Sequence, residues 1–334
     1  MTDTTDRLKC AVLDDNLHAA ASCADWSLVQ DRIDVTFFHE RLEGVEHVVH
    51  TLREFHIVVL MRERTAFGRE VIEQLPHLRL IVTAGHRNGA LAVEAARVRG
   101  IPVLGTPILE TPAVELTWAL LLALARNVPR EVEALRNAVG WQCALGVDLS
   151  GATLGLIGLG RLGARVSAIA RAFGMHVIAW SQNLREERCT EIGVERGGSL
   201  IELMNRSDFV SIHSVLSERT LRLVGPEEIA AMKPSAFLIN TSRAPIVDED
   251  ALIAALVAGR IAGAGLDVFH QEPLAPDHPY RSLRNVIATP HLGYVTRHTY
   301  ELVYRSVVED LRAWLEARRL REVVEEHPAR ALGG

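Results

Sequence analysis

The chain has 334 residues, of which 48% are hydrophobic and 23% charged, and its formal net charge is −6. This length exceeds what one ordinary core serves, so we expect two domains of an ordinary globular protein. The acidic balance gives no reason to expect a nucleic-acid partner. The longest run without Asp, Glu, Lys or Arg, residues 172–184, is shorter than the roughly 20 residues of a membrane span, so we expect no membrane partner.

The amino-terminal segment MTDTTDR lacks the basic-then-apolar order of a secretory signal. The four cysteines are scattered, without a CxxC pair, which favours reduced thiols in a cytoplasmic protein. No His and Cys residues show the spacing of a metal site, so no metal is expected.

The first part of the chain is predicted to be an α/β unit. Its strand candidates are residues 9–15, 56–61, 78–85 and 101–106, with helical stretches between them. A helix is predicted from Thr111, which can cap it, with Pro112 in its first turn. From Val114 to Ala125 this helix is apolar nearly all round, so we expect it to be deeply buried.

A second α/β unit is predicted from Thr153 onward. Its strand candidates are residues 154–158, 176–180, 209–213, 236–240, 262–268 and 285–289. Helical segments such as 200–207 and 249–259 alternate with them, which implies a parallel sheet covered on both faces. Residues 298–319 have apolar residues at helical spacing and are predicted to be a long amphipathic helix that returns to the first unit.

The stretch TLGLIGLGRLG, residues 153–163, combines a strand, a GxGxxG turn and the start of a helix. In a dinucleotide-binding turn, the first glycine allows the tight turn and the second lets the pyrophosphate approach the backbone. The third allows close packing of helix and strand, and the helix N-terminus offers N–H groups to the phosphates. Gly158, Gly160 and Gly163 therefore predict a dinucleotide site.

The acid that usually follows such a turn by about 20 residues, and holds the adenosine ribose, is missing. No Asp or Glu occurs between Gly158 and Glu186, and the expected position reads Trp180-Ser181-Gln182. Ser181 can bond a 2′-hydroxyl or a 2′-phosphate, so NAD(H) and NADP(H) both stay open. Arg185 and Arg188 are near enough in sequence to reach a phosphate, although a solvated surface position explains them as well.

Polar residues follow several predicted strands, at the sheet edge where ligands bind in open parallel sheets. Arg243, Glu272 and His291 come from three separate strand ends. Arginine offers a fixed fork of donors for the carboxylate of a 2-keto acid. Histidine can protonate the alkoxide formed in reduction, and a carboxylate beside it favours its protonated form. Together these residues predict a hydride-transfer site that relies on a nicotinamide cofactor.

At this point the chain resembles the D-isomer-specific 2-hydroxyacid dehydrogenases. The matching segments lie between residues 80 and 300. They are VTAGHRN, RGIPVLGTP, ELTWALLLALAR, TLGLIGLGRLG, HSVLSERT, MKPSAFLINTSRAPIVDEDAL, AGAGLDVFHQEPL and NVIATPHLG.

The resemblance implies two Rossmann-like domains with parallel sheets: a flavodoxin-like substrate domain of residues 1–107 plus 297–334, and an inserted NAD(P)-binding domain of residues 108–296. It also implies a homodimer, with the helix from Thr111 forming much of the interface.

The resemblance further assigns roles to single residues. Arg243 binds substrate, His291 is the acid–base and Glu272 is the carboxylate that pairs with it. The loop at Gly85, His86 and Arg87 holds the substrate carboxylate; Arg87 hints at a further anionic group, although an ion pair to Glu110 or another acid explains it equally. The residues implied in cofactor binding are Gly158, Gly160, Arg161, Leu162, Gly163, Ser181, Val215, Thr220, Thr241 and Asp267.

There are departures from the family pattern. Leu91-Ala92 replaces the usual Ile-Asp, which puts the anchoring of the substrate loop in question, and Asn88 looks like a pocket residue. Tyr294 either narrows the pocket or packs at a domain interface. Two alternatives to a 2-hydroxyacid dehydrogenase stay open: an enzyme similar to phosphite dehydrogenase, and a non-catalytic NAD(H)-sensing protein. The glutamate at position 272 argues against a formate dehydrogenase, where glutamine is usual.

Overall fold

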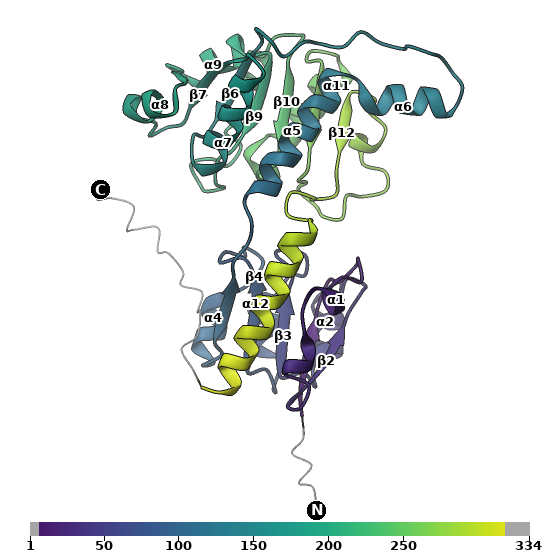
Figure 1. Cartoon of the computed structure of the whole chain (residues 1–334), viewed down its shortest axis with the longest axis vertical. Helices are drawn as coiled ribbons and strands as arrows, with labels where there is room; N and C mark the ends of the chain where they lie inside the picture. Colours follow the sequence, from purple (N-terminus) through teal and green to yellow (C-terminus); the bar gives the residue numbers. More distant parts are fainter. Residues whose placement is uncertain (1–6, 318–334) are drawn as a thin grey trace, which may run out of the picture. The chain divides into compact units, whose positions relative to one another are not determined.

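The computed structural model of the protein describes residues 7–317, and these form two compact α/β units (Figure 1). One unit holds residues up to Leu109 together with the segment from Thr296, and the other holds Glu110–Val295. Both are built on parallel sheets, so the predicted fold class is confirmed. The outer ends of the predicted substrate domain, residues 1–6 and 318–334, lie outside the described residues.

The first unit has a five-stranded parallel sheet in the order β2-β1-β3-β4-β5. Its strands are β1 (Leu8–Val12), β2 (Ile33–Phe37), β3 (Ile57–Leu60), β4 (Leu80–Ala84) and β5 (Val103–Thr106). Its helices are α1 (Ala20–Cys23), α2 (Val45–Leu52), α3 (Arg69–Glu73), α4 (Val93–Val98) and the long α12 (Arg297–Leu315). The helix α12 contacts α1, β4 and β5 and buries Val303, Tyr304, Val307 and Leu311.

The second unit has a seven-stranded parallel sheet in the order β12-β11-β10-β9-β6-β7-β8. Its strands are β6 (Thr153–Ile157), β7 (His176–Trp180), β8 (Glu195–Arg196), β9 (Phe209–Ile212), β10 (Phe237–Asn240), β11 (Gly263–Leu266) and β12 (Val286–Ala288). Its helices are α5 (Thr111–Ala125), α6 (Val128–Arg136), α7 (Arg161–Ala172), α8 (Glu186–Ile192), α9 (Leu200–Arg206), α10 (Pro226–Ala230) and α11 (Glu249–Val257).

The core of the second unit lies on both faces of its sheet. In β10, Leu238 packs into one hydrophobic cluster and Ile239 into the other, as expected for successive residues of a doubly covered strand. The helices α5 and α7 contact each other and cover one face, and α5 also contacts β10 and β11 (Figure 1). The expected deep burial of the helix that starts at Thr111 is confirmed, since Trp118, Leu121 and Leu124 are buried.

The strand order of the second unit reverses between β6 and β9. From β6 the chain runs outward to β7 and β8, then crosses back to β9 and runs the other way. A crevice forms at such a reversal, beyond the carboxyl ends of the strands, and ligands of doubly wound sheets bind there. The glycine turn after β6 and the segment after β9 therefore border the expected ligand site.

No helix within residues 7–317 is long and apolar enough to cross a membrane. In the same part of the chain, no group of three or more His, Cys, Asp or Glu could hold a metal ion.

Candidate active site

The glycine turn joins β6 to α7 in the backbone geometry that a bound dinucleotide needs. Gly158 has a φ of +103°, and a Cβ there would lie 2.7 Å from the carbonyl oxygen of His213. A Cβ on Gly163 would collide with the carbonyl oxygen of Gly158. At Gly160, by contrast, a Cβ would meet no atom within 4 Å, so the turn is open on that side. The two tight glycines hold the turn against its neighbours, and the open one leaves room for a phosphate at the start of α7.

A groove of about 710 Å³ runs from this turn along the ends of β7 and β9. Five of the residues predicted to bind cofactor line it: Gly158, Gly160, Ser181, Val215 and Thr220. Trp180, Gln182, Asn183, His213 and Ser214 line it as well. Burial lowers the pKa of His213 to about 4, and its Nε2 lies 2.9 Å from the Oγ of Ser211.

The other predicted cofactor residues lie outside the groove lining. Arg161 is exposed at the start of α7, and its guanidinium is paired with the carboxylate of Glu110 at 2.7 Å. Glu110 therefore has a partner within its own unit. Leu162 and Gly163 lie in the first turn of α7. Thr241 follows β10, and its Oγ1 lies 2.7 Å from the Oγ1 of Thr117 in α5.

Asp267 is buried directly after β11 and holds the loop that carries His291. Its carboxylate accepts hydrogen bonds from the hydroxyl of Thr289 (2.6 Å) and from the backbone N–H groups of Leu292 (2.7 Å) and Gly293 (2.8 Å). Burial raises the pKa of Asp267, although these bonds act in the opposite direction. The sequence predicted Asp267 to bind the cofactor, and a role in fixing this loop was missed.

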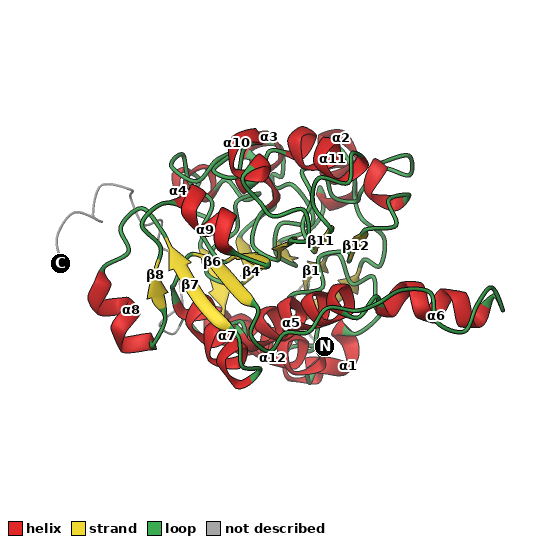
Figure 2. Ribbon diagram, turned by 90° about the horizontal axis from the view of Figure 1, so that it is seen from above, coloured by secondary structure: helices red, strands yellow, loops and turns green. Residues whose placement is uncertain are grey.

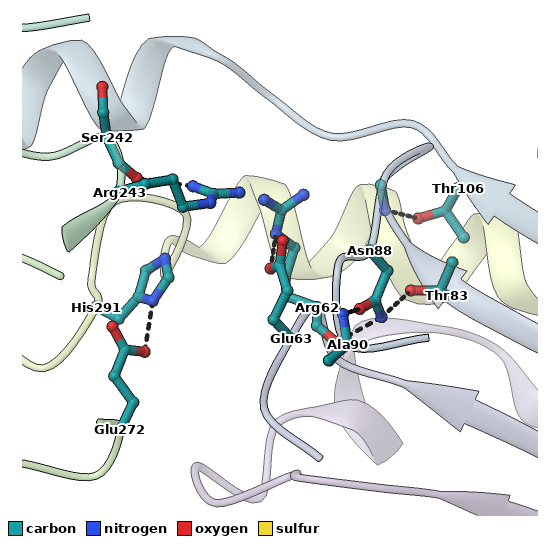
Figure 3. Close-up of polar contacts among 11 residues, drawn as sticks. Arg62, Glu63, Thr83, Asn88, Ala90, Thr106, Ser242, Arg243, Glu272 and His291 are labelled. Atoms are coloured by element: carbon teal, nitrogen blue, oxygen red, sulfur yellow. Dashed lines mark hydrogen bonds and ion pairs between the residues drawn. The ribbon is translucent and has the colours of Figure 1, made fainter. Parts of the chain in front are cut away.

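His291 and Glu272 form a hydrogen-bonded pair in the second unit (Figure 3). The Nδ1 of His291 lies 2.8 Å from Oε2 of Glu272, and Oε1 of Glu272 accepts the N–H of Phe269 at 2.9 Å. Figure 3 shows the second ring nitrogen of His291 on the side away from Glu272. Both side chains are partly exposed, at 23% for His291 and 36% for Glu272.

The electrostatic coupling of this pair is visible in the pKa of Glu272. Burial raises that pKa, but the hydrogen bond from His291 and its positive charge oppose burial, and the pKa ends below its ordinary value. The positive charge of Arg243 acts in the same direction. The Glu272 carboxylate therefore stays ionised beside the imidazole and accepts its hydrogen bond.

The backbone of His291 adopts a left-handed conformation with φ of +53°. For a residue other than glycine this costs on the order of 1–2 kcal/mol, so the surrounding contacts must hold it. The hydrogen bonds of Asp267 to Leu292 and Gly293 do so, because they fix the two residues that follow. The ring of Tyr294, which is buried, stands edge-on to the imidazole at 5.6 Å between centroids.

Arg243 is presented by a short turn after β10. The side chain of Asn240 bridges this turn: its Nδ2 donates to the carbonyl of Arg243 at 3.0 Å, and its Oδ1 accepts the N–H of Ser242 at 3.0 Å. One guanidinium nitrogen of Arg243 also donates to the carbonyl of Ser242 at 2.8 Å. Asn240 is buried and was not predicted as a site residue.

In the first unit, the loop after β4 contains the predicted substrate residues Gly85, His86 and Arg87. Gly85 is buried with φ of +86°, while His86 and Arg87 are exposed. Asn88 was expected in the pocket. Its amide instead braces the loop, donating to the carbonyl of Arg62 (2.7 Å) and to Thr83 Oγ1 (2.9 Å) and accepting the N–H of Ala90 (2.9 Å) (Figure 3). This loop is therefore anchored without the usual Ile-Asp.

Sequence reasoning also missed Arg62, which follows β3. A Cβ on Gly85 would lie 2.5 Å from a guanidinium nitrogen of Arg62, so this side chain passes directly over the loop. The Nε of Arg62 lies 3.5 Å from the carboxylate of Glu63. Arg62 directly follows the strand predicted at residues 56–61, and a cation at that place in the sequence could have been predicted as a site residue.

A doubly wound unit with a glycine turn and a His–Glu pair at its strand ends defines a dinucleotide-dependent oxidoreductase. A profile described as "D-isomer specific 2-hydroxyacid dehydrogenase, NAD binding domain" matches residues 118–293. The chain belongs to this family of D-isomer-specific 2-hydroxyacid dehydrogenases, which confirms the family that its sequence motifs resemble. The prediction of a dehydrogenase of the D-2-hydroxyacid type is thus confirmed.

Among curated relatives, the chain is 40% identical over 258 residues to a glyoxylate reductase of Aeropyrum pernix, a match covering 75% of this chain and 77% of that one. It is 38% identical over 270 residues to a D-3-phosphoglycerate dehydrogenase of Methanocaldococcus jannaschii, covering 80% of this chain but only 51% of that longer enzyme. Among solved structures, a phosphoglycerate oxidoreductase of Vibrio cholerae superposes with a TM-score of 0.88 at 32% identity, covering 93% of this chain and 99% of that one.

Proposed function

We propose that the chain interconverts 2-keto acids and D-2-hydroxy acids, with His291 as the acid–base and Arg243 as the substrate-binding cation. The observation that carries this proposal is the 2.8 Å contact between His291 Nδ1 and Glu272 Oε2. Acid–base catalysis needs a histidine that is held in place by a carboxylate, whereas NAD(H) sensing makes no such demand. The pair therefore favours catalysis over the sensing alternative.

The residues of the second unit fit a dinucleotide. The open side of Gly160 and the first turn of α7 provide N–H groups for a pyrophosphate, and the groove extends to Ser181 at the ribose position. We assign pyrophosphate contacts to Arg161 and Leu162, packing of the turn to Gly163, and the wall of the groove to Val215 and Thr220. We assign cofactor contacts beyond the groove lining to Thr241 and Asp267. When bound, the nicotinamide supplies the hydride for reduction of the keto carbon, or accepts it in the reverse direction.

The side chains of the protein bind the substrate carboxylate and transfer the proton. Arg243 binds the substrate carboxylate through its fork of donors. Glu272 accepts a hydrogen bond from the Nδ1–H of His291. The other ring nitrogen is then the one that delivers a proton to the substrate oxygen in reduction and removes it in oxidation. For the first unit, we propose that the backbone at Gly85 and His86, with Arg87, contacts the substrate.

A first prediction concerns Glu272→Gln, which keeps the shape of the side chain but removes its charge. Reduction needs protonated His291, so its rate should begin to decline at a lower pH than in the wild type. Oxidation needs the unprotonated ring, so its acidic limit should also move to lower pH. The measurement is the pH dependence of kcat/KM in both directions.

The matched control is Glu249→Gln. Glu249 lies 3.6 Å from His278, a second His–Glu contact in the same unit that the proposal does not use. Its profiles should superimpose on those of the wild type. If the profiles of Glu272→Gln also superimpose, Glu272 does not tune His291.

We further propose that the protein is a homodimer, and that α6 with the segment after it forms the interface. We call residues 128–147 the arm; it extends away from the sheet of the second unit (Figure 2). The arm exposes Val128, Val132, Leu135, Val139, Trp141, Leu145 and Val147. Glu131 braces it by accepting the N–H groups of Cys143 and Ala144 at 3.0 and 2.9 Å. Grouped exposed apolar side chains support an interaction surface.

The expected interface was different, with the helix from Thr111, α5, forming much of the contact between the two copies. Most apolar side chains of α5 are already buried within its own unit. Trp141 and Leu145 are 82% and 96% exposed, so they have the most apolar surface left to cover.

A second prediction follows for the variant Trp141→Ser/Leu145→Ser. Removing these two side chains should convert a dimer into a monomer, as measured by light scattering coupled to size-exclusion chromatography. Val257→Ser, which removes another exposed apolar side chain of the same unit, should leave the mass unchanged. A double variant that keeps the dimeric mass would exclude the arm as the interface.

The cytoplasmic location stays a prediction. It is supported by the four cysteines, Cys10, Cys23, Cys143 and Cys189, which form no disulfide.

A further inference from the structure

The ribose end of the groove is positively charged. Its lining includes three arginines, Arg185, Arg188 and Arg219, against two glutamates, Glu187 and Glu191. Arg188 is paired with Glu191 at 2.7 Å, so these two charges largely satisfy each other. Arg185 and Arg219 remain, opposed by Glu187. Ser181 stands where a dinucleotide site specific for NAD carries an acid.

The segment that carries these residues is held in a defined turn. The N–H of Leu184 donates to the carbonyl of Ser181 at 3.1 Å, and Arg196 Nε donates to the carbonyl of Leu184 at 3.0 Å. The amide of Gln182 donates to the carbonyl of Arg219 at 3.3 Å, which ties the turn to the segment after β9. Arg185 follows Ser181 by four residues, at the end of this turn, and lines the groove.

Arg185 is exposed and, among residues 7–317, makes no ion pair. An arginine that is paired with a carboxylate of its own chain must break that ion pair to bind a ligand, and Arg188, which is paired with Glu191, is in this position. Arg185 has no such ion pair to break. A guanidinium also matches the geometry of a phosphate through two parallel hydrogen bonds.

We propose that this end of the groove binds a 2′-phosphate, so that the enzyme takes NADP(H) at least as readily as NAD(H), with Arg185 as the principal cation and Ser181 as a hydroxyl partner. The proposal rests on the dinucleotide site of the proposed function and concerns only its ribose end. An aspartate or glutamate at position 181 would repel a 2′-phosphate, whereas the serine hydroxyl can donate a hydrogen bond to it.

The test compares two ligands that differ only in the 2′-phosphate: adenosine 2′,5′-bisphosphate and adenosine 5′-monophosphate. Isothermal titration calorimetry on the full chain gives the dissociation constant of each. The wild type should bind the bisphosphate about tenfold more tightly or better, as expected for a charge-assisted hydrogen bond. Arg185→Gln should lose about tenfold in affinity for the bisphosphate and leave the monophosphate unchanged. Ser181→Asp should lose more, because it adds repulsion.

The matched control is Arg260→Gln, which removes a charge from the same unit outside the groove lining. It should change neither dissociation constant. Equal binding of the two ligands by the wild type would overturn the proposal, as would an equal loss for both ligands in Arg185→Gln. Failure of the dinucleotide site on which the proposal rests gives a different result, because neither ligand would then bind. His291→Ala should retain both affinities, since this measurement involves no turnover.

Discussion

His291→Ala is expected to lower kcat/KM in both directions by about 10²–10⁴-fold, the usual contribution of a positioned general acid–base. The alkoxide formed by reduction must be protonated as it forms, and alanine offers no proton. In the reverse direction no base remains to accept the hydroxyl proton. Affinity for the cofactor should be unchanged, because His291 follows β12, whereas the cofactor groove lies along β6, β7 and β9.

Steady-state kinetics in both directions, with the cofactor dissociation constant measured separately, would check this result. His176→Ala is a suitable control, since His176 is exposed at the start of β7 and should contribute nothing to turnover. A His291→Ala enzyme that stays within tenfold of the wild type would remove His291 from the acid–base role.

The second large effect is expected for Arg243→Gln. The substrate carboxylate would lose a charge-assisted, two-pronged hydrogen bond worth about 2–3 kcal/mol, or roughly 30- to 150-fold in kcat/KM. Most of the loss should appear in KM. Arg243→Lys should be intermediate, because lysine keeps the charge but not the planar fork.

Kinetics with saturating cofactor would measure this loss. Because removal of Arg243 also removes one positive charge that lowers the pKa of Glu272, a smaller change in the pH profile should accompany it. If KM for every 2-keto acid is unchanged in Arg243→Gln, the substrate carboxylate binds elsewhere.

The sequence predicted the second unit well because its signals are local. The GxGxxG turn lies between a clear strand and a clear helix, and the structure has β6, the turn and α7 in that order. The pairing of His291 with Glu272, which 19 residues separate, was expected from the family resemblance, and β11 and β12, the strands before them, are neighbours. The structure has the two side chains in contact.

Two strands escaped prediction for physical reasons. In β2 (Ile33–Phe37), Asp34 and Thr36 are exposed on an edge strand, so the segment lacks the continuous apolar run of the other strands. The strand β8 has only two residues, both exposed, and forms by pairing with β7 rather than by its own composition. Both segments are strands because they pair with a neighbouring strand, β1 or β7, and that pairing cannot be read from their own residues.

The supporting residues of the site were the hardest to predict. Asp267 follows a strand, as ligand-binding acids often do, and only its three hydrogen bonds to Thr289, Leu292 and Gly293 identify it as the residue that holds the His291 loop. Asn88 looked like a pocket residue from its place in the family pattern, yet its amide is bonded to Arg62, Thr83 and Ala90. Which way a side chain turns depends on contacts far apart in the sequence.

The most direct measurement is oxidation of NADH and NADPH by the wild-type chain with a panel of 2-keto acids of different chain length and charge, alongside His291→Ala. Phosphite with the oxidised cofactors tests the phosphite dehydrogenase alternative in the same assay. We predict turnover of at least one 2-keto acid to the D-hydroxy acid by the wild type, and a loss of about a hundredfold or more in His291→Ala. Cofactor binding without turnover of any 2-keto acid, or equal rates in the two proteins, would contradict the account.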